Sequence, residues 1–419
     1  MSNGIGAGTL SRRALLRRAA GLGLATPLTA AVLAACGGAT SSTATAGTTA
    51  STTATGSSAA TAGVGTGAPG AAASPVGSAG TLSAASGWKP RQLSVKLTGS
   101  GSSFVDPAMQ SWIKAYQTLA PNVSINYQSV GSGQGKKDFI GGITTFAGSD
   151  APMTDAEMQQ APGSIHLPDV IGAVTVLYNL PGADKLQFSG ETIAGIFQGK
   201  ITTWNDPKIA ADNSGAKLSN TPITVVHRSD GSGTTAIFTD YLSKVSPDWK
   251  SAVGSGTTVS WPVGVGAQQS PGVTAAVQQT PGAISYVELI YALQNNLPTP
   301  SVKNSSGKFV VPTLESSAAA AAAYLNNIPA DMRVFITNPS PGDDAYPITG
   351  FSWLIIHPTY TDATTAQALT DFLYWALTDG QTISQQLKYA PIPAPVQQRE
   401  IQQLSQVKAG GQPAFQAPA

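Results

Sequence analysis

Residues 223–242 decide the fold and read Ile-Thr-Val-Val-His-Arg-Ser-Asp-Gly-Ser-Gly-Thr-Thr-Ala-Ile-Phe-Thr-Asp-Tyr-Leu. An apolar, strand-like run (223–226) leads through a Gly/Ser turn into an amphipathic, helix-like run (236–242). Glycines let backbone N–H groups approach a ligand closely, and a helix N-terminus carries unsatisfied donors and a partial positive charge. Arg228 offers a bidentate fork for an oxyanion, and Ser232 and Thr234 add hydroxyls. Alone, the stretch is compatible with an oxyanion site and with an ordinary helix cap.

Three further polar turns follow strand-like runs upstream. They read Thr-Gly-Ser-Gly-Ser-Ser-Phe (98–104), Val-Gly-Ser-Gly-Gln-Gly (130–135) and Thr-Phe-Ala-Gly-Ser-Asp-Ala-Pro (145–152). The first two follow the alternating runs 93–97 and 123–127, and the third brings an acidic residue, Asp150. Each turn alone is an ordinary cap or hairpin signal. Together they predict an α/β chain whose strand-to-helix turns share one anion site.

Helical periodicity completes this pattern. A helix is predicted from Asp106-Pro107, since proline suits the first turn, and its apolar residues fall at helical spacing: Met109, Trp112, Ile113, Tyr116 and Leu119. The sequence also predicts helices over 136–143, 317–325 and 364–377, a helix, turn and strand over 272–291, and a buried strand over 350–356.

Common nucleotide and hydrolase motifs do not fit these turns. A P-loop fails around residues 130–137, because Val130 and Lys137 stand where glycine and Ser/Thr are required. A dinucleotide fingerprint fails because its last position is Lys136 in one turn and Phe104 in another. No G-x-S-x-G elbow surrounds these serines.

Histidine and cysteine are scarce. The chain holds His166, His227 and His357, and Cys36 is its single cysteine. We interpret His227 as a structural or rim residue, because strand alternation points it and Arg228 to opposite faces. One cysteine excludes an intrachain disulfide, and scattered histidines disfavour a zinc site. We therefore expect no catalytic residue, no metal and no cofactor.

The first 35 residues are predicted to be an export signal. An apolar run (19–35) follows four basic residues, without any acidic residue in the segment: Arg12, Arg13, Arg17 and Arg18. Residues 11–17 resemble a twin-arginine motif, although general secretion also uses basic n-regions. Residues 33–37, Leu-Ala-Ala-Cys-Gly, resemble a bacterial lipobox. Cys36 is then the lipidated first residue of the mature chain; the alternatives are an ordinary buried thiol and a signal-anchor residue.

Composition sets further limits. With 419 residues, 42% hydrophobic and 11% charged, the chain is long enough for two packed domains. Without the signal, 23 − 4 = 19 basic residues face 22 acidic ones, a formal net charge of −3. We therefore expect no nucleic-acid partner. Residues 36–87 are predicted to be a lipidated cysteine and a disordered Ala/Gly/Ser/Thr tether, because 37–87 contain no charge and little apolar surface.

Several motifs, in order, resemble one known family. The four turns at 98–104, 131–133, 147–152 and 228–234 are similar to those of the phosphate-binding proteins of bacterial high-affinity phosphate ABC transporters. Supporting similarities lie at 201–206, 254–256, 259–264, 281–288, 346–348 and 389–391. The resemblance covers roughly residues 93–398.

The resemblance implies an α/β, two-lobed periplasmic-binding-protein fold of type II, with the ligand in the cleft between the lobes. Lobe I would comprise residues 88–177 plus 348–412, and lobe II residues 178–347. The chain would cross between the lobes near Tyr178 and return near Pro347.

The resemblance also implies a ligand shell. Phosphate would be bound by Ser102, Ser103, Phe104 (through its backbone N–H), Ser132, Asp150, Arg228, Ser232, Gly233 and Thr234. Asp230 would hold Arg228 in orientation from behind. The chain departs from the family pattern at Ser103, where threonine is usual, and at Gln134, where serine or glycine is usual.

Asp150 gives the sharpest functional expectation. A carboxylate in an anion site is repulsive unless the ligand brings a proton, which hydrogen phosphate does and sulfate at neutral pH does not. Sites built to hydrogen-bond discriminate against an unmatched ligand by about 10⁴ to 10⁵. The alternative for Asp150 is a helix N-cap before Pro152.

The expected function follows from the resemblance. The chain would bind inorganic phosphate outside the cytoplasmic membrane, as a lipid-anchored monomer, and deliver it to the permease subunits and ATPase of an ABC importer. A surface lipoprotein that senses phosphate and a phosphatase-like enzyme on the same fold remain as alternatives.

Overall fold

The computed structural model describes residues 81–183 and 185–418. These residues fall in a compact unit that extends from Ala73 to Ala419. The predicted export signal, Cys36 and the predicted tether up to residue 80 lie outside the described residues.

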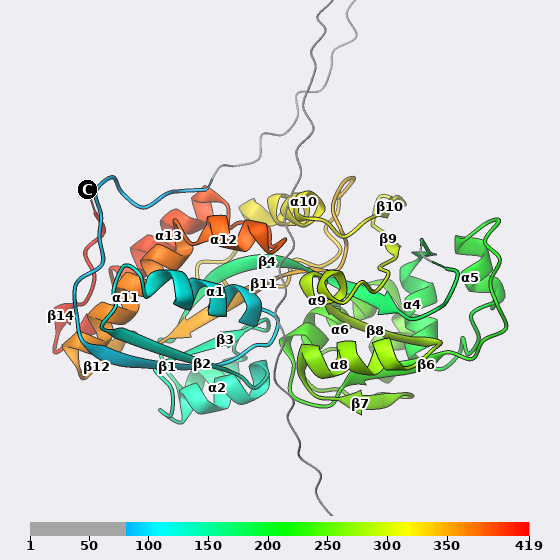
Figure 1. Cartoon of the computed structure of the whole chain (residues 1–419), viewed down its shortest axis with the longest axis horizontal. Coiled ribbons are helices and arrows are strands. Elements are labelled where there is room, and N and C mark those ends of the chain that lie inside the picture. Colours follow the sequence, from blue (N-terminus) through cyan, green and yellow to red (C-terminus); the bar gives the residue numbers. More distant parts are fainter. Residues whose placement is uncertain (1–80, 184, 419) are drawn as a thin grey trace, which may run out of the picture. The chain divides into compact units, whose positions relative to one another are not determined.

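One mixed sheet of eight strands runs through this unit in the order β2-β1-β3-β11-β4-β8-β6-β7 (Figure 1). Its strands are β1 (Val95–Gly101), β2 (Val123–Ser129), β3 (Phe146–Ser149), β4 (Ile165–Tyr178), β6 (Thr224–Arg228), β7 (Val265–Ala267), β8 (Ala283–Glu288) and β11 (Thr349–Ile356). The first three are parallel to one another, β11 and β4 are antiparallel to their neighbours, and β6 is parallel to β7 and β8.

Strand β4 belongs to both lobes. Its first part, Ile165–Ala173, pairs with β11, and its last part, Val174–Tyr178, pairs with β8. Nearly all of its residues are buried, as its apolar sequence requires for a strand covered on both faces. The exchange of partners between Ala173 and Val174 lies a few residues before Tyr178, where we expected the crossing; the lobe limits remain a proposal.

Lobe I contains strands β1, β2, β3 and β11 and most of the helices at the left of Figure 1. Its helices are α1 (Asp106–Tyr116), α2 (Ser132–Ile140), α3 (Asp155–Gln160), α11 (Ala363–Leu377), α12 (Gln381–Gln386) and α13 (Ala394–Leu404). A small sheet of β12 (Thr359–Tyr360), β13 (Lys408–Ala409) and β14 (Gln412–Pro413) lies at its edge. The apolar residues predicted for α1 are buried except Leu119, which follows the helix and is exposed.

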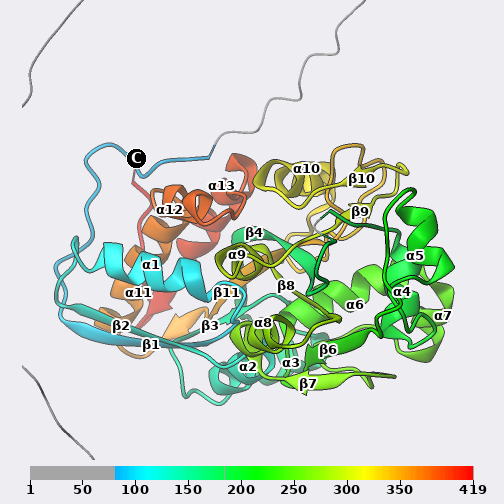
Figure 2. The ribbon, with the colours of Figure 1, turned by 45° about the vertical axis from the view of Figure 1, so that its right-hand side comes forward.

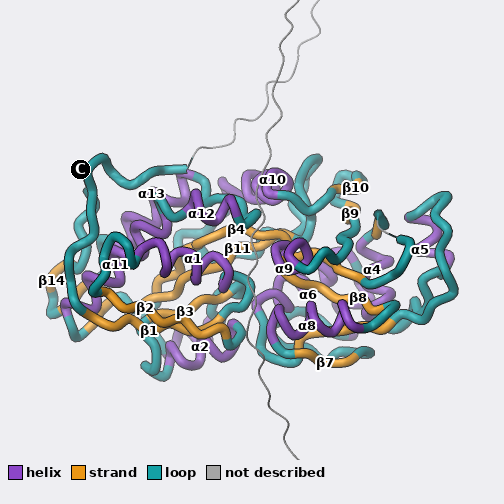
Figure 3. Tube along the Cα trace, in the orientation of Figure 1, coloured by secondary structure: helices purple, strands orange, loops and turns teal. Residues whose placement is uncertain are grey.

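Lobe II contains β6, β7 and β8, and Figures 2 and 3 show its helices around these strands. The helices are α4 (Gly190–Phe197), α5 (Pro207–Asp212), α6 (Gly233–Val245), α7 (Pro247–Ala252), α8 (Gln269–Gln279) and α9 (Leu289–Gln294). A second small sheet is formed by β5 (Gln187–Phe188), β9 (Ser301–Lys303) and β10 (Phe309–Val310). Among the described residues, no helix is both long enough and apolar enough to cross a membrane.

Helix α10 (Leu314–Tyr324) and the short η1 (Leu325–Asn327) differ from the expected lobe division. We expected them in lobe II, yet α10 contacts β4 and β11. The following residues Met332 and Ile336 lie in one buried cluster with lobe I residues such as Trp353. The small side chains of this alanine-rich helix let it approach the sheet closely, which explains why it packs there.

Helix α2 also begins earlier than predicted, at Ser132 rather than at Lys136. Gly131 has a φ of 87°, a left-handed conformation that turns the chain directly into the helix. The glycines that suggested a longer turn lie inside the helix. Close neighbours explain why these positions are glycine: a Cβ on Gly135 would lie 2.3 Å from the Cα of Gly101.

Residues 82–91 lie on lobe I. The backbone N–H of Leu82 donates to Gln397, that of Ala85 donates to the Tyr374 hydroxyl, and the Trp88 ring packs on Tyr374. Arg91 forms a bidentate ion pair with Asp371. Ordered contacts therefore begin several residues before Trp88, where we expected the folded region to start.

Candidate functional site

Three of the turns meet at Asp150. The hydroxyl of Ser102 donates to Asp150 Oδ1, and the hydroxyl of Ser132 donates to Oδ2 at 3.4 Å. The backbone N–H of Asp150 in turn donates to Ser132 Oγ at 3.2 Å. Asp150 is 1% exposed, and it does not cap α3, whose N-cap is Thr154. The alternative of a cap before Pro152 is thereby excluded, and Asp150 lies among hydroxyl donors.

Close backbone packing brings these turns together. Gly131 N–H donates to Gly101 O at 2.7 Å, and Ser102 N–H donates to Gly148 O at 2.9 Å. The glycines leave no room for a side chain: a Cβ on Gly148 would lie 2.3 Å from the Tyr127 hydroxyl. The carboxyl ends of β1 and β3 therefore present their polar side chains at one place.

The stretch from Arg228 to Thr235 supplies the lobe II side of the site. Ser232 is the N-cap of α6, and its hydroxyl accepts from Thr235 N–H at 3.1 Å. Gly233 faces lobe I, because a Cβ there would lie 2.6 Å from both Asp150 N and Ser132 Oγ. The hydroxyl of Thr234 is buried and has no hydrogen-bond partner among the described residues. The positive end of α6 thus lies beside the backbone of Asp150 and the hydroxyl of Ser132.

Arg228 is oriented by Asp230. Nε donates to Oδ1 at 2.7 Å and Nη2 donates to Oδ2 at 2.5 Å, while Gln269 N–H donates to the same Oδ1 at 3.0 Å. Arg228 is 4% exposed. Although burial acts to raise it, the pKa of Asp230 lies below its ordinary value because Arg228 donates to it. The expected role of Asp230 agrees with this geometry.

The two lobes touch through backbone and small side chains around the site. Gly133 N–H donates to Gly231 O at 2.8 Å, and Gln269 Nε2 donates to Ser129 O at 2.7 Å. A Cβ on Gly131 would lie 2.3 Å from Asp230 Oδ2. The residues predicted to contact the ligand are at most 4% exposed, whereas the side chain of Asp230 is 16% exposed. In this structure the lobes are closed over the site.

Burial changes the ionisation of Asp150. Desolvation raises the pKa of this carboxyl to about 6, although hydroxyl donors and the charge of Arg228 act in the opposite direction. At neutral pH Asp150 is therefore mostly a carboxylate and accepts hydrogen bonds.

Two of the predicted donors are already engaged. The hydroxyl of Ser103 lies 3.0 Å from that of Ser270 and accepts from Ser270 N–H at 3.1 Å. The backbone N–H of Phe104 donates to Ser102 Oγ at 2.9 Å. Ser103 thus links the first turn to α8 of lobe II, and Ser270 is a residue that the sequence analysis missed.

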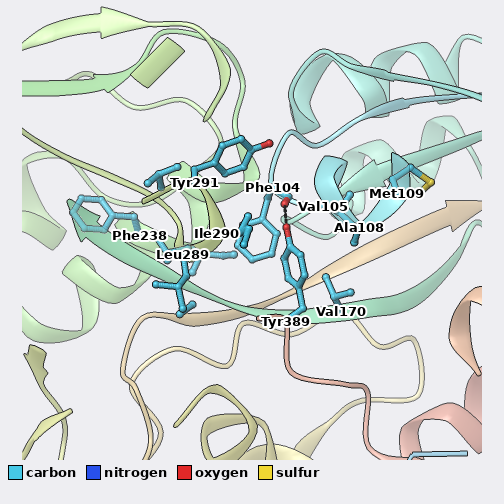
Figure 4. Packing of buried hydrophobic residues seen from close by; sticks show 14 of the residues in the cluster. Phe104, Val105, Ala108, Met109, Val170, Phe238, Leu289, Ile290, Tyr291 and Tyr389 are labelled. Carbon is cyan, nitrogen blue, oxygen red and sulfur yellow. Dashed lines mark hydrogen bonds between the residues drawn. The ribbon is translucent and has the colours of Figure 1, made fainter. Parts of the chain in front are cut away.

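Three tyrosines, also missed, hold the first turn from behind. Their hydroxyls donate to successive backbone carbonyls: Tyr127 to Ser102 O, Tyr291 to Ser103 O and Tyr389 to Phe104 O. Figure 4 shows Tyr389 directed at Phe104, with this bond dashed, within the buried cluster. All three come from elements distant in sequence, so no local pattern could reveal them.

A separate cavity of about 360 Å³ lies on lobe II beside Arg228. His227 and Trp261 line it, and their rings stack 5.0 Å apart. Thr257 and Thr258 also line it, whereas Asp150 does not. Arg228 lines it too, and our interpretation of His227 as a structural or rim residue stays a prediction. Among the described residues, no group of three or more His, Cys, Asp or Glu is placed to hold a metal ion.

Comparisons with known proteins identify the family of this chain. Residues 34–380 match the model of the PBP superfamily domain. The phosphate-binding protein PstS of Pasteurella multocida (strain Pm70) is 42% identical over 316 residues, which cover 75% of this chain and 91% of that protein. The protein of the same name from Xylella fastidiosa (strain 9a5c) is 41% identical over 302 residues, 72% of this chain and 82% of that protein. The chain belongs to the phosphate-binding protein PstS family.

The fold of this family member is shared with solved structures. An ancestral soluble variant of the human phosphate binding protein has a TM-score of 0.59 at 23% identity, covering 73% of this chain and 92% of that one. The chain therefore has the periplasmic-binding-protein fold that the motifs predicted, and the four turns lie where its two lobes meet.

Proposed function

We propose that this chain binds inorganic phosphate, as hydrogen phosphate, outside the cytoplasmic membrane and delivers it to an ABC-type phosphate importer. The names of its relatives support this function. The observation that carries it is the carboxylate of Asp150, which is buried among hydroxyl donors, while Gly233 at the N-terminus of α6 lies against the backbone of Asp150.

The carboxylate of Asp150 favours an anion that carries a proton over one that does not. Hydrogen phosphate donates a hydrogen bond to Asp150 through its O–H and accepts hydrogen bonds from the remaining donors. Sulfate at neutral pH has no O–H and cannot donate a hydrogen bond. Facing lone pairs without a hydrogen between them are repulsive, and the site is buried, so water does not compensate.

Donors from both lobes would bind the other phosphate oxygens. We assign this role to the guanidinium of Arg228, to the hydroxyls of Ser232 and Thr234 and to the N–H of Gly233. The hydroxyls of Ser102 and Ser132 would join them by turning to the ligand from Asp150, to which they donate in this structure. Thr234 supports the assignment because its buried hydroxyl has no partner in the described chain. Hydrogen bonds to charged groups contribute about 1.5–3 kcal/mol each, so such a shell offsets the desolvation of the anion.

Ser103 and Phe104 complete the proposed shell from the first turn. The Ser103 hydroxyl donates to the ligand if Ser270 is the donor of the bond between the two hydroxyls, whereas the Phe104 N–H would have to turn from Ser102 to the ligand. Asp230 keeps Arg228 in place.

The cellular setting is proposed from the sequence. Cys36 would be lipidated after removal of the signal, so that the chain is a monomer anchored to the outer face of the cytoplasmic membrane. Its partners would be the permease subunits and ATPase of the importer. Retention of a Cys36→Ala variant at the membrane would contradict the anchor.

Calorimetry with the purified chain in EDTA tests the function. We expect tight binding of phosphate at pH 7.5 and sulfate binding weaker by at least about 10⁴-fold. Equal affinity for the two anions, or dependence on a divalent metal, would overturn the proposal. We also propose that the chain is not an enzyme, and turnover of a chromogenic phosphate ester would contradict that statement.

A further inference from the structure

A row of three polar residues crosses the sheet behind the site. Strand β11 pairs Trp353 with Ser149 of β3, and extending this antiparallel register by one residue sets Ser352, which precedes Trp353, beside Asp150. On its other edge, β11 pairs Ser352 with Val170 and Trp353 with Pro168 of β4. Asp169 is therefore the extra residue of a β-bulge beside Ser352. Bulges redirect side chains and are common next to functional sites.

The polar atoms of this row are buried and incompletely paired. Asp169 and Ser352 are both 0% exposed. Asp169 Oδ1 accepts from Val170 N–H at 2.8 Å, whereas Asp169 Oδ2 and Ser352 Oγ have no partner of ordinary geometry among the described residues. The Ser352 hydroxyl nevertheless lowers the pKa of both Asp150 and Asp169, so it lies within interaction range of both carboxyls.

The surroundings favour a neutral Asp169. Burial raises its pKa well above the ordinary value and the charge of Asp150 raises it further, although hydrogen bonds from Ser352 and the backbone act in the opposite direction. Glu400 of α13, also fully buried, has its pKa raised by burial and then by Asp169. The other titratable or charged groups around the row are Tyr127 of β2, Glu288 of β8, Tyr291, Tyr389, Arg399 of α13 and Arg228 across the lobe boundary.

We propose that Asp169 is a positioning residue for the ligand site: as a neutral carboxylic acid it donates through Ser352 to Asp150, and so keeps Asp150 a carboxylate. Asp169 Oδ2–H donates to Ser352 Oγ, and Ser352 O–H donates to Asp150. This arrangement satisfies both orphaned atoms at once. It rests on the proposed function, in which Asp150 accepts the proton of hydrogen phosphate.

The acceptor positions of the Asp150 carboxylate explain what the relay would do. A carboxylate has about four acceptor positions. Ser102 and Ser132 occupy two in this structure, and Ser352 would take a third. When Ser102 and Ser132 turn their hydroxyls to the phosphate, as proposed above, Ser352 stays on Asp150 as a donor from the protein beside the proton of the ligand. Because the relay stabilises the charged form of Asp150, it extends to lower pH the range in which the site selects a protonated anion.

Phosphate titrations from pH 5 to pH 8 test this relay in four variants of the chain: wild type, Asp169→Asn, Asp169→Leu and Ser352→Ala. In wild type we expect the affinity for phosphate to decrease as the pH is lowered, because Asp150 becomes protonated. In Asp169→Asn, whose amide still donates, we expect the same midpoint. In Asp169→Leu and Ser352→Ala we expect the midpoint to rise by about one pH unit, the size of one lost hydrogen bond to a charged group. The ionisation of phosphate itself is common to all arms and cancels.

The outcomes separate the alternatives. A midpoint that falls in Asp169→Asn would mean that an ionised Asp169 had been removed, and unchanged midpoints in both Asp169→Leu and Ser352→Ala would mean a structural role only; either result overturns the inference. If Asp169→Leu does not fold, Ser352→Ala, which removes one oxygen, decides alone.

Glu400→Gln is the matched control, since it changes a buried carboxyl of the same region without touching Ser352. A midpoint shift there as large as in Ser352→Ala would overturn the relay. Absence of phosphate binding in wild type would instead contradict the proposed function.

Discussion

At the scale of single residues, Asp150 combines two opposed demands. The site needs its charge to recognise a proton on the ligand, whereas burial disfavours that charge and raises its pKa to about 6. A pKa above the ordinary 3.8 means that the folded chain binds this proton more readily than the unfolded chain does. The resulting stabilisation is complete below about pH 3.8 and is lost as the pH rises through about 6.

Asp150→Asn tests both demands. The amide can donate to an anion that lacks a proton, so we expect competition by sulfate to increase by several orders of magnitude in calorimetry. Without ligand at pH 7.5, we expect the variant to be more stable than wild type by up to about 3 kcal/mol, and this difference to vanish below about pH 4. Unchanged competition by sulfate, measured beside wild type, would count against the role of Asp150.

At the scale of elements, α2 and α6 meet end to end through glycine. The close approach of Gly133 to Gly231 and of Gly233 to Asp150 occurs only when the lobes are closed. Glycine is a poor residue inside a helix, costing about 1 kcal/mol relative to alanine. Its presence in the first turn of α2 is explained by the opposite lobe rather than by the helix.

Gly133→Ala should therefore separate stability from binding. A Cβ there would lie 2.9 Å from the Cα of Gly231, so we expect phosphate affinity to fall at least tenfold, while the ligand-free chain unfolds at the same or a higher temperature. Gly272→Ala in α8 is the control, since its Cβ would meet only the Cβ of Ala267 at 4.0 Å. Equal phosphate affinity in the two variants would refute this view of lobe closure.

The limits of prediction from sequence are clearest at this scale. The four turns and the strands before them follow local patterns, so the sequence predicts them, whereas the roles of Asp150 and Asp230 as ligand and positioning residues stay predictions. Ser270, Asp169 and the tyrosine bonds depend on register and packing between distant segments, which local periodicity does not encode. The early start of α2 was missed for the same reason, because its glycines serve contacts made by other elements.

At the scale of the whole molecule, the described chain begins on lobe I. Asp371 is 5% exposed, and its two oxygens are held by Arg91. Such a pair stabilises mainly because removing one partner leaves the other buried and unpaired.

We expect Arg91→Ala to lower the free energy of unfolding by roughly 1–3 kcal/mol, measured by urea denaturation, with phosphate affinity unchanged. Lys200→Ala, which breaks the exposed pair with Asp248, should change it much less, because solvent screens this pair. If both substitutions had equal effects, residues 82–91 would not be fastened to lobe I by this pair.

Strand β4 has a mechanical consequence for the exchange of ligand. Since one continuous strand is hydrogen-bonded to β11 on one side of the lobe boundary and to β8 on the other, the lobes can separate without breaking these ladders. Opening would then twist the shared strand, in contrast to rotation of two lobes about a flexible loop. We therefore expect the shared sheet to resist large separation of the lobes and to favour their return to the same register.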